Sequence, residues 1–268
     1  MDDRFAPAAA TWVARLGLLR NVVRQEVVRR QLTGVLGRPG RALDVGAGQG
    51  TQAIALARDG WTVDAAEPDP GMRSRLNEAL DAVPPEARAR VRVCDVRVDE
   101  LDAMRQTYDL VLCHGVLMYL ESPDAAVGSL AGRVAPGGAV SIVARNAQAM
   151  AWRPALRGDW AGVLAMLAEL SAAAREGRDP LYRNEIGVSA RADSVEHITE
   201  LLTGCGLSRS TWFGVRVATD GVDVRTPVPE DQALLASLLD AEEALGRTEP
   251  YRRVATLFHV VGWRDDPA

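Results

Sequence analysis

A glycine-rich turn between an apolar run and a helical segment constrains this chain more than any other feature. The turn Gly46-Ala47-Gly48-Gln49-Gly50 follows the apolar residues 41–45 and precedes a helical pattern over 51–58. Glycines allow a tight turn and let a ligand approach the backbone closely. A strand that passes through such a turn into a helix begins a βαβ unit, which predicts a parallel sheet.

The alternation of strand and helix patterns continues along the chain and predicts one α/β domain. A helix over 12–36 precedes the first strand, and helices at about 71–82 and 123–134 separate strands at 61–66, 91–94, 109–114 and 139–144. The remaining expected elements are helices near 160–174, 194–203 and 229–245 and a closing antiparallel pair of strands at 207–217 and 255–263. The absence of a low-complexity linker favours one domain with two insertions over two domains.

Composition narrows the class of protein. The chain has 268 residues and a net charge of −5, which argues against a protein that coats nucleic acid generally, though not against a local basic groove. The three cysteines are widely spaced and no Cys/His pattern suits a metal, so we expect no metal site. No signal peptide or membrane-spanning run is apparent, which predicts a cytoplasmic protein with no membrane partner.

Four markers stand at the ends of successive predicted strands, where open α/β sheets bind ligands. The spacing at the turn is GxGxG, with Asp44 two residues before Gly46, whereas a dinucleotide site has GxGxxG. Glu67 ends the second strand, and a carboxylate there can accept hydrogen bonds from ribose hydroxyls. The other two markers are Asp95-Val96-Arg97 and Pro136-Gly137-Gly138.

Together these markers resemble the class I S-adenosylmethionine (SAM) methyltransferases. The resemblance implies a Rossmann-like, mostly parallel seven-stranded sheet with helical insertions, and SAM as the cofactor. It implies that SAM contacts the first turn, the ends of the second and third strands, and an arginine of the first helix. The expected cofactor-binding residues are Arg20, Asp44, Gly46, Ala47, Gly48, Glu67, Asp95, Val96, Arg97 and His114.

Over residues 15–264 the chain is similar to one such family, the tRNA 5-carboxymethoxyuridine methyltransferases. The matching segments are Leu19–Val23, Tyr108–His114, Asn146-Ala147, Gly214–Val217, Glu249–Arg252 and Phe258–Val260. Arg20 matches the family's cofactor-binding arginine, and His114 matches its cofactor-side histidine. The expected catalytic residues are His114, Asn146 and Arg216, with Arg216 orienting an acceptor carboxylate.

The chain also departs from that family. Ala47 replaces a glycine and keeps the small size, and Glu67 replaces an aspartate and should still reach the ribose. Residues 168–183 carry three arginines and three acids, where the family member known best has a lysine-rich run. A tRNA acceptor would favour a positive face there.

Several readings therefore remain open. The leading function is O-methylation of a carboxylate on a modified tRNA wobble uridine. The alternatives are O- or N-methylation of a small metabolite and a SAM-binding module without catalysis, so the expected partners are SAM and either tRNA or an anionic small molecule. Within a single domain over 1–268, residues 1–40 are expected to form a helical lid, and 146–190 and 218–254 to form substrate-side insertions. Asn146 could instead be a turn residue, His114 a structural histidine and Arg20 a solvated arginine.

Overall fold

The computed structural model describes residues 9–266 and divides them into two compact units. The glycine-loop unit comprises Leu36–Val143, Glu196–Thr211 and the residues from Val260 onward. The arginine unit, so called for its buried arginines, comprises the residues up to Val35 together with Ala144–Val195 and Trp212–His259. The prediction of one domain with a lid and two insertions stays a prediction.

A seven-stranded, mostly parallel sheet is the framework of the fold, as the sequence predicts. Its strand order is β3-β2-β1-β4-β5-β9-β8, and β1 pairs in parallel with both β2 and β4. The strands are β1 Arg41–Val45, β2 Thr62–Ala66, β3 Val91–Cys94, β4 Tyr108–His114, β5 Val134–Arg145, β8 Arg209–Val215 and β9 Leu257–Trp263. Strands β1, β2 and β4 are almost wholly buried, as expected for a parallel sheet covered on both faces.

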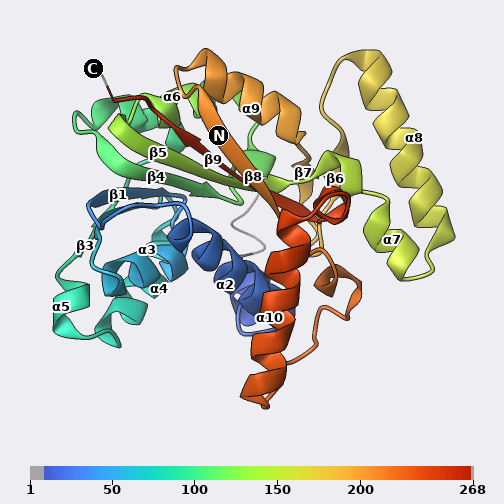
Figure 1. Cartoon of the computed structure of the whole chain (residues 1–268), viewed down its shortest axis with the longest axis horizontal. Helices are drawn as coiled ribbons and strands as arrows, with labels where there is room; N and C mark the ends of the chain where they lie inside the picture. The colour runs from blue at the N-terminus through green and yellow to red at the C-terminus, as the bar shows by residue number, and fades with distance from the viewer. Residues whose placement is uncertain (1–8, 267–268) are drawn as a thin grey trace. The chain divides into compact units, whose positions relative to one another are not determined.

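Helices cover both faces of the strands within the glycine-loop unit. Figure 1 shows α3 and α4 on one side of β1–β4, and α6 and α9 on the other. These helices are α3 Thr51–Arg58, α4 Pro70–Asp81, α6 Asp124–Ala131 and α9 Val195–Gly204, and the short α5 is Pro85–Arg88. Asp69 caps α4 by accepting a hydrogen bond from the Met72 N–H, and Pro70 occupies its first turn.

The arginine unit contains the remaining helices and a small hairpin. Helices α2 and α10 lie side by side, as do α7 and α8 (Figure 1). The elements are α1 Ala9–Ala14, α2 Leu19–Thr33, α7 Trp152–Leu156, α8 Trp160–Glu176, β6 Leu181–Arg183, β7 Ser189–Arg191 and α10 Gln232–Arg247. None of the helices within residues 9–266 is both long enough and apolar enough to cross a bilayer.

Two local predictions are wrong. The helix predicted over 12–36 is two helices, because Leu18 is extended and the Leu19 N–H donates to the Thr226 carbonyl. The turn predicted at Pro136-Gly137-Gly138 lies within β5, where the register against β4 shifts between Tyr108 and Leu110. A Cβ at Gly138 would lie 2.9–3.0 Å from three backbone oxygens, so only glycine fits this irregular pairing.

Candidate functional site

The glycine turn leaves open space at one of its three glycines. Gly46, Gly48 and Gly50 all have positive φ angles, of 70°, 58° and 85°. A Cβ at Gly46 would collide with Val116, and one at Gly50 would collide with Leu76. A Cβ at Gly48 would meet no atom within 4 Å. Gly46 and Gly50 are therefore required by packing, whereas Gly48 presents bare backbone to empty space that a ligand can fill.

Glu67 holds this turn from the end of β2. One of its carboxylate oxygens accepts a hydrogen bond from the Gly48 N–H at 2.7 Å, and the other accepts from the Asp69 N–H at 2.9 Å. The Gly46 and Ala47 N–H groups donate to the carbonyl of Ala66 at the same strand end. Burial raises the pKa of Glu67 although these backbone donors oppose the rise. Glu67 is thus a buried carboxylate beside the open glycine.

Asp44, in β1 two residues before Gly46, provides a second carboxylate next to the same turn. Its side chain is only 3% exposed, and one oxygen, Oδ2, is buried without a hydrogen-bond partner. Burial, and then the charge of Glu67, raise the pKa of Asp44 to about 7. A buried, incompletely bonded acid is costly unless a ligand supplies a donor or a positive charge. The turn therefore suits a ligand with a cationic group.

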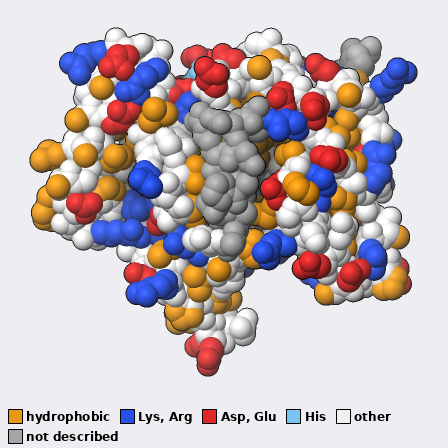
Figure 2. All heavy atoms as spheres, turned by 180° about the vertical axis from the view of Figure 1, so that it is seen from behind, with side chains coloured by type: hydrophobic (Ala, Val, Ile, Leu, Met, Phe, Trp, Pro, Cys, Tyr) orange, Lys and Arg blue, Asp and Glu red, His pale blue; other side chains and the backbone are white. Residues whose placement is uncertain are grey.

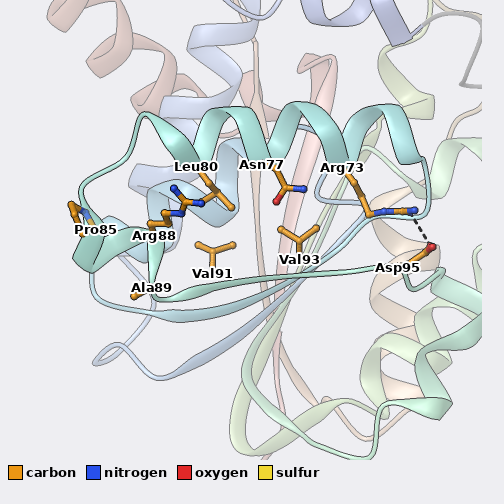
Figure 3. Close-up of a pocket in the computed structure, with 9 residues that line it drawn as sticks. All are labelled: Arg73, Asn77, Leu80, Pro85, Arg88, Ala89, Val91, Val93 and Asp95. Carbon is orange, nitrogen blue, oxygen red and sulfur yellow. Dashed lines mark hydrogen bonds and ion pairs between the residues drawn. The ribbon is translucent and has the colours of Figure 1, made fainter.

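Asp95, Val96 and Arg97 follow the edge strand β3 in an open part of the glycine-loop unit. The Asp95 carboxylate accepts from Arg73 at 2.9 Å and is 67% exposed. It stands at one end of a groove of about 760 Å³ between α4 and β3, into which Val91 and Val93 project (Figure 3). Val96 is half-buried, and the Arg97 side chain pairs with Asp99.

His114 and Asn146 have defined polar contacts. The Nε2 atom of His114, the last residue of β4, lies 2.7 Å from the Ser141 hydroxyl. Asn146 is 1% exposed; its amide donates to the carbonyls of Arg253 and Ala255, and its oxygen accepts from the Gln148 N–H. These contacts build the turn after β5. The possible catalytic roles of both residues stay predictions.

Arg20 and Arg216 lie in a buried ionic cluster of the arginine unit. The fully buried Asp220 accepts from Arg20 at 2.8 Å and also pairs with Arg153 and Arg216. Glu185 accepts from Arg20 at 2.6 Å and lies 3.3 Å from Arg153. Arg216 is a non-glycine residue with φ of 61°, a strained conformation that persists where the surrounding structure imposes it. The pKa of Asp220 is well below its usual range because arginines surround it, against the opposing effect of burial.

The sequence did not reveal Asp220 and Glu185 as the centres of this cluster. Arg20 is separated from them by 200 and 165 positions along the chain, so no local motif joins the three. The sequence pattern that comes closest to indicating the cluster is the four-residue spacing of Arg216 and Asp220. That spacing predicts an ion pair only within a helix, and these residues do not lie in one. Among residues 9–266, no group of three or more His, Cys, Asp or Glu side chains could hold a metal ion.

Comparisons with known proteins identify the class of fold. Residues 43–140, which contain the glycine turn, Glu67 and Asp95, match the family model described as a methyltransferase domain. The magnesium protoporphyrin IX methyltransferase of Synechocystis, solved with bound SAH, superposes with a TM-score of 0.61 at 15% identity, covering 98% of this chain and 97% of that one. A possible histamine N-methyltransferase of Thermotoga maritima superposes at 0.58 with 14% identity, covering 99% and 100%. The chain therefore has the class I methyltransferase fold.

Similar curated proteins differ in their acceptors. The tRNA 5-carboxymethoxyuridine methyltransferase of Escherichia coli is 28% identical over 138 residues, covering 50% of this chain and 52% of that protein. A ubiquinone biosynthesis O-methyltransferase of Klebsiella pneumoniae is 32% identical over 139 residues, covering 52% and 55%. Each match thus spans only about half of the relative's length.

Proposed function

We propose that this chain is a SAM-dependent methyltransferase whose glycine-loop unit binds the cofactor. The observation that carries this proposal is the open, left-handed Gly48 beside two buried carboxylates, one of which has an unpartnered oxygen. The residues that would hold SAM are Gly46, Ala47 and Gly48 through their backbone, Asp44 and Glu67 through their carboxylates, and Asp95, Val96 and Arg97 at the end of β3. SAM is a cation at its sulfonium, which suits this acidic site.

When bound, SAM supplies a methyl group on an activated sulfonium. The protein must then align an acceptor atom with that methyl group and exclude water, and it needs no metal to do so. Arg20 is proposed to pair with the SAM carboxylate; its Nε atom is buried without a partner, while its Nη atoms engage Glu185 and Asp220. His114 is proposed to line the cofactor side of the reaction site.

For the acceptor we propose an ionised oxygen, most simply a carboxylate. The buried arginines and the partial similarity to the Escherichia coli enzyme support this proposal. Because of the same similarity, a modified tRNA wobble uridine is the leading acceptor. Arg216 would orient the carboxylate and Asn146 would face the acceptor. A carboxylate needs no general base because it is already ionised at neutral pH.

A small metabolite is the second candidate acceptor. Residues 168–183 balance three arginines with three acids, and the α7–α8 region exposes Trp152, Leu156, Trp160 and Leu164. Hydrophobic side chains are visible along the left edge of Figure 2. Because that view is turned by 180°, this edge is the right-hand side of Figure 1, where α7 and α8 lie. Such a surface suits an apolar molecule better than a polyanion.

A radiolabelled methyl-transfer assay tests both candidates. Bulk tRNA and a cell-metabolite extract serve as acceptors, and the label should enter an ester that mild base releases. The rate should stay flat from about pH 6 to 9, and a chelator should leave it unchanged. Arg216→Ala should lower kcat/KM with little change in SAM affinity. A steep rise in rate through pH 7–8 with an ether or amine product would contradict the carboxylate acceptor.

Hydrogen exchange tests the proposed lid. Amides of α2 should exchange more slowly when SAM is added, because a segment ordered by a ligand opens less often. Equal exchange with and without SAM would contradict a closing role for residues 1–40, of which 1–8 lie outside the described residues.

A further inference from the structure

Arg145, the last residue of β5, is a buried arginine without a carboxylate partner. Its side chain is 5% exposed, and its Nη1 atom donates only to the Thr256 carbonyl, at 3.3 Å. The guanidinium carbon lies 5.3 Å from the centre of the Tyr182 ring. The Nε atom is buried with no hydrogen-bond partner. A buried arginine is normally paired, so this one requires an explanation.

The neighbouring acids are already occupied by other arginines. Asp220 pairs with Arg20, Arg153 and Arg216, and Glu185 contacts Arg20, Arg153 and Arg157. Asp179 and Asp193 both pair with Arg191. Together with Arg145, six arginines therefore share four carboxylates in this part of the arginine unit. Because Arg157 is 37% exposed and solvated, the five remaining arginines exceed the four carboxylates by one positive charge.

Of these six arginines, Arg145 is the one for which the described residues provide no ion pair to a carboxylate. Burial, and then the nearby Arg153, lower the pKa of the Arg145 guanidinium to about 10. Arg191 provides the contrast, since it is 4% exposed but has two carboxylate partners. A charge that serves folding alone would be matched in the same way, because an unmatched buried charge destabilises the protein.

We propose that Arg145 binds an anionic oxygen group of the acceptor, a carboxylate or a phosphate, in addition to the carboxylate that is methylated. This inference rests on the proposed function and defines the acceptor as a molecule with two anionic groups. The anion at Arg145 would balance the one arginine that lacks a carboxylate partner. The planar guanidinium can form paired hydrogen bonds with either oxyanion, and the Tyr182 ring holds its face.

Calorimetry with simple anions tests this assignment without methyl transfer. The probes are succinate, inorganic phosphate and acetate, at an ionic strength kept constant with sodium chloride. Wild-type protein should bind succinate or phosphate at least tenfold more tightly than acetate. Arg145→Met should abolish that preference, and Arg145→Lys should retain part of it. Comparing succinate with phosphate identifies which oxyanion the site prefers.

Thermal unfolding without ligand separates a binding role from a structural one. Arg145→Met should leave the Tm unchanged or raise it, because it removes an unmatched buried charge. The matched control Arg191→Met should lower the Tm, because it removes the ion pairs that Arg191 makes with Asp179 and Asp193. Equal anion binding by wild type and Arg145→Met, or a clear loss of Tm in Arg145→Met, would overturn the inference.

SAM titration of the same samples distinguishes the two proposals. If wild type binds SAM but shows no Arg145-dependent anion binding, the inference fails and the proposed function stands. If wild type binds no SAM, the proposed function fails, whatever the anions do.

Discussion

The two units of this chain differ in the charges that they bury: among the described residues, the glycine-loop unit buries acids, whereas the arginine unit buries arginines together with acids. The glycine-loop unit places Asp44 and Glu67, 3% and 7% exposed, at its glycine turn. The arginine unit buries Arg20, Arg145 and Arg216, at 3%, 5% and 7%. Both units leave charged side chains with unpartnered buried atoms, among them Oδ2 of Asp44 in the first and Nε of Arg145 in the second. The first unit therefore suits a cationic ligand, and the second suits an anionic ligand. The SAM sulfonium is cationic, and the carboxylate acceptor proposed above is anionic.

The partners of a buried charge indicate whether it stabilises the fold or is available to a ligand. Asp220 is buried but surrounded by arginines, and Asp64 is buried but bonded to Arg92 and Tyr108. Such acids have lowered pKa values, whereas the pKa of Asp44 is raised. The raised pKa of Asp44 thus reflects burial beside another acid without a cationic partner, which is the pattern expected where a ligand supplies the compensating charge.

The largest expected effect comes from removing the acid that anchors the arginine unit. Asp220→Asn leaves Arg20, Arg153 and Arg216 without their shared partner and should reduce the free energy of unfolding by about 3–5 kcal/mol. Urea unfolding at pH 7 measures it. Because folding lowers the pKa of Asp220, its contribution is present at neutral pH and is lost as the pH falls through the folded-state value.

The control for this variant is Asp240→Asn. Asp240 pairs with Arg30 at 2.6 Å but is 71% exposed, so its loss should cost less than about 1 kcal/mol. Equal effects of the two substitutions would show that the buried cluster does not hold the arginine unit together.

The next effect concerns the cofactor. Glu67→Ala removes the acceptor for the Gly48 N–H and for the proposed ribose hydroxyls, and should weaken SAM binding by about 1.5–3 kcal/mol, or roughly 10- to 150-fold. Glu67→Asp keeps the carboxylate and should recover part of the affinity. Calorimetry measures both variants, with Glu78→Ala on the exposed face of α4 as the control. Unchanged affinity in Glu67→Ala would remove Glu67 from the site.

Much of the acidic half of this comparison was predictable from the sequence. Strands β1–β4 and the residues at their ends follow from short apolar runs and turn residues, which are local patterns. The acidic partners of Arg20 follow from contacts between segments 165 and 200 positions apart, which no local pattern encodes. For the same reason, the sequence alone does not distinguish Arg145 from Arg216, and only their partners in the structure do.

Alanine substitutions at two glycines of the turn distinguish a role in packing from a role in ligand binding. Gly50→Ala forces a Cβ against Leu76 and should lower the free energy of unfolding by about 1–3 kcal/mol. Gly48→Ala places its Cβ in open space, so it should cost only the roughly 1–2 kcal/mol of a left-handed alanine while weakening SAM binding at least tenfold. Urea unfolding and SAM calorimetry on both variants check this. Normal SAM affinity in Gly48→Ala would show that the space at Gly48 is not the cofactor's.

The smallest expected effect is a pH dependence of SAM affinity that originates at Asp44. With a pKa of about 7, Asp44 is mostly protonated at pH 6 and mostly ionised at pH 8 in the free protein. A cationic ligand favours the ionised form, so SAM should bind about tenfold more tightly at pH 8 than at pH 6, which corresponds to about 1.4 kcal/mol. Binding at pH 6 should therefore release close to one proton, which calorimetry in buffers of different ionisation enthalpy detects. Asp44→Asn should bind SAM weakly and equally at both pH values, because an amide cannot ionise. Proton release that persists in Asp44→Asn would assign the titration to Glu67, whose pKa is also raised by burial, and would make Glu67 the acid that senses the charge of the cofactor.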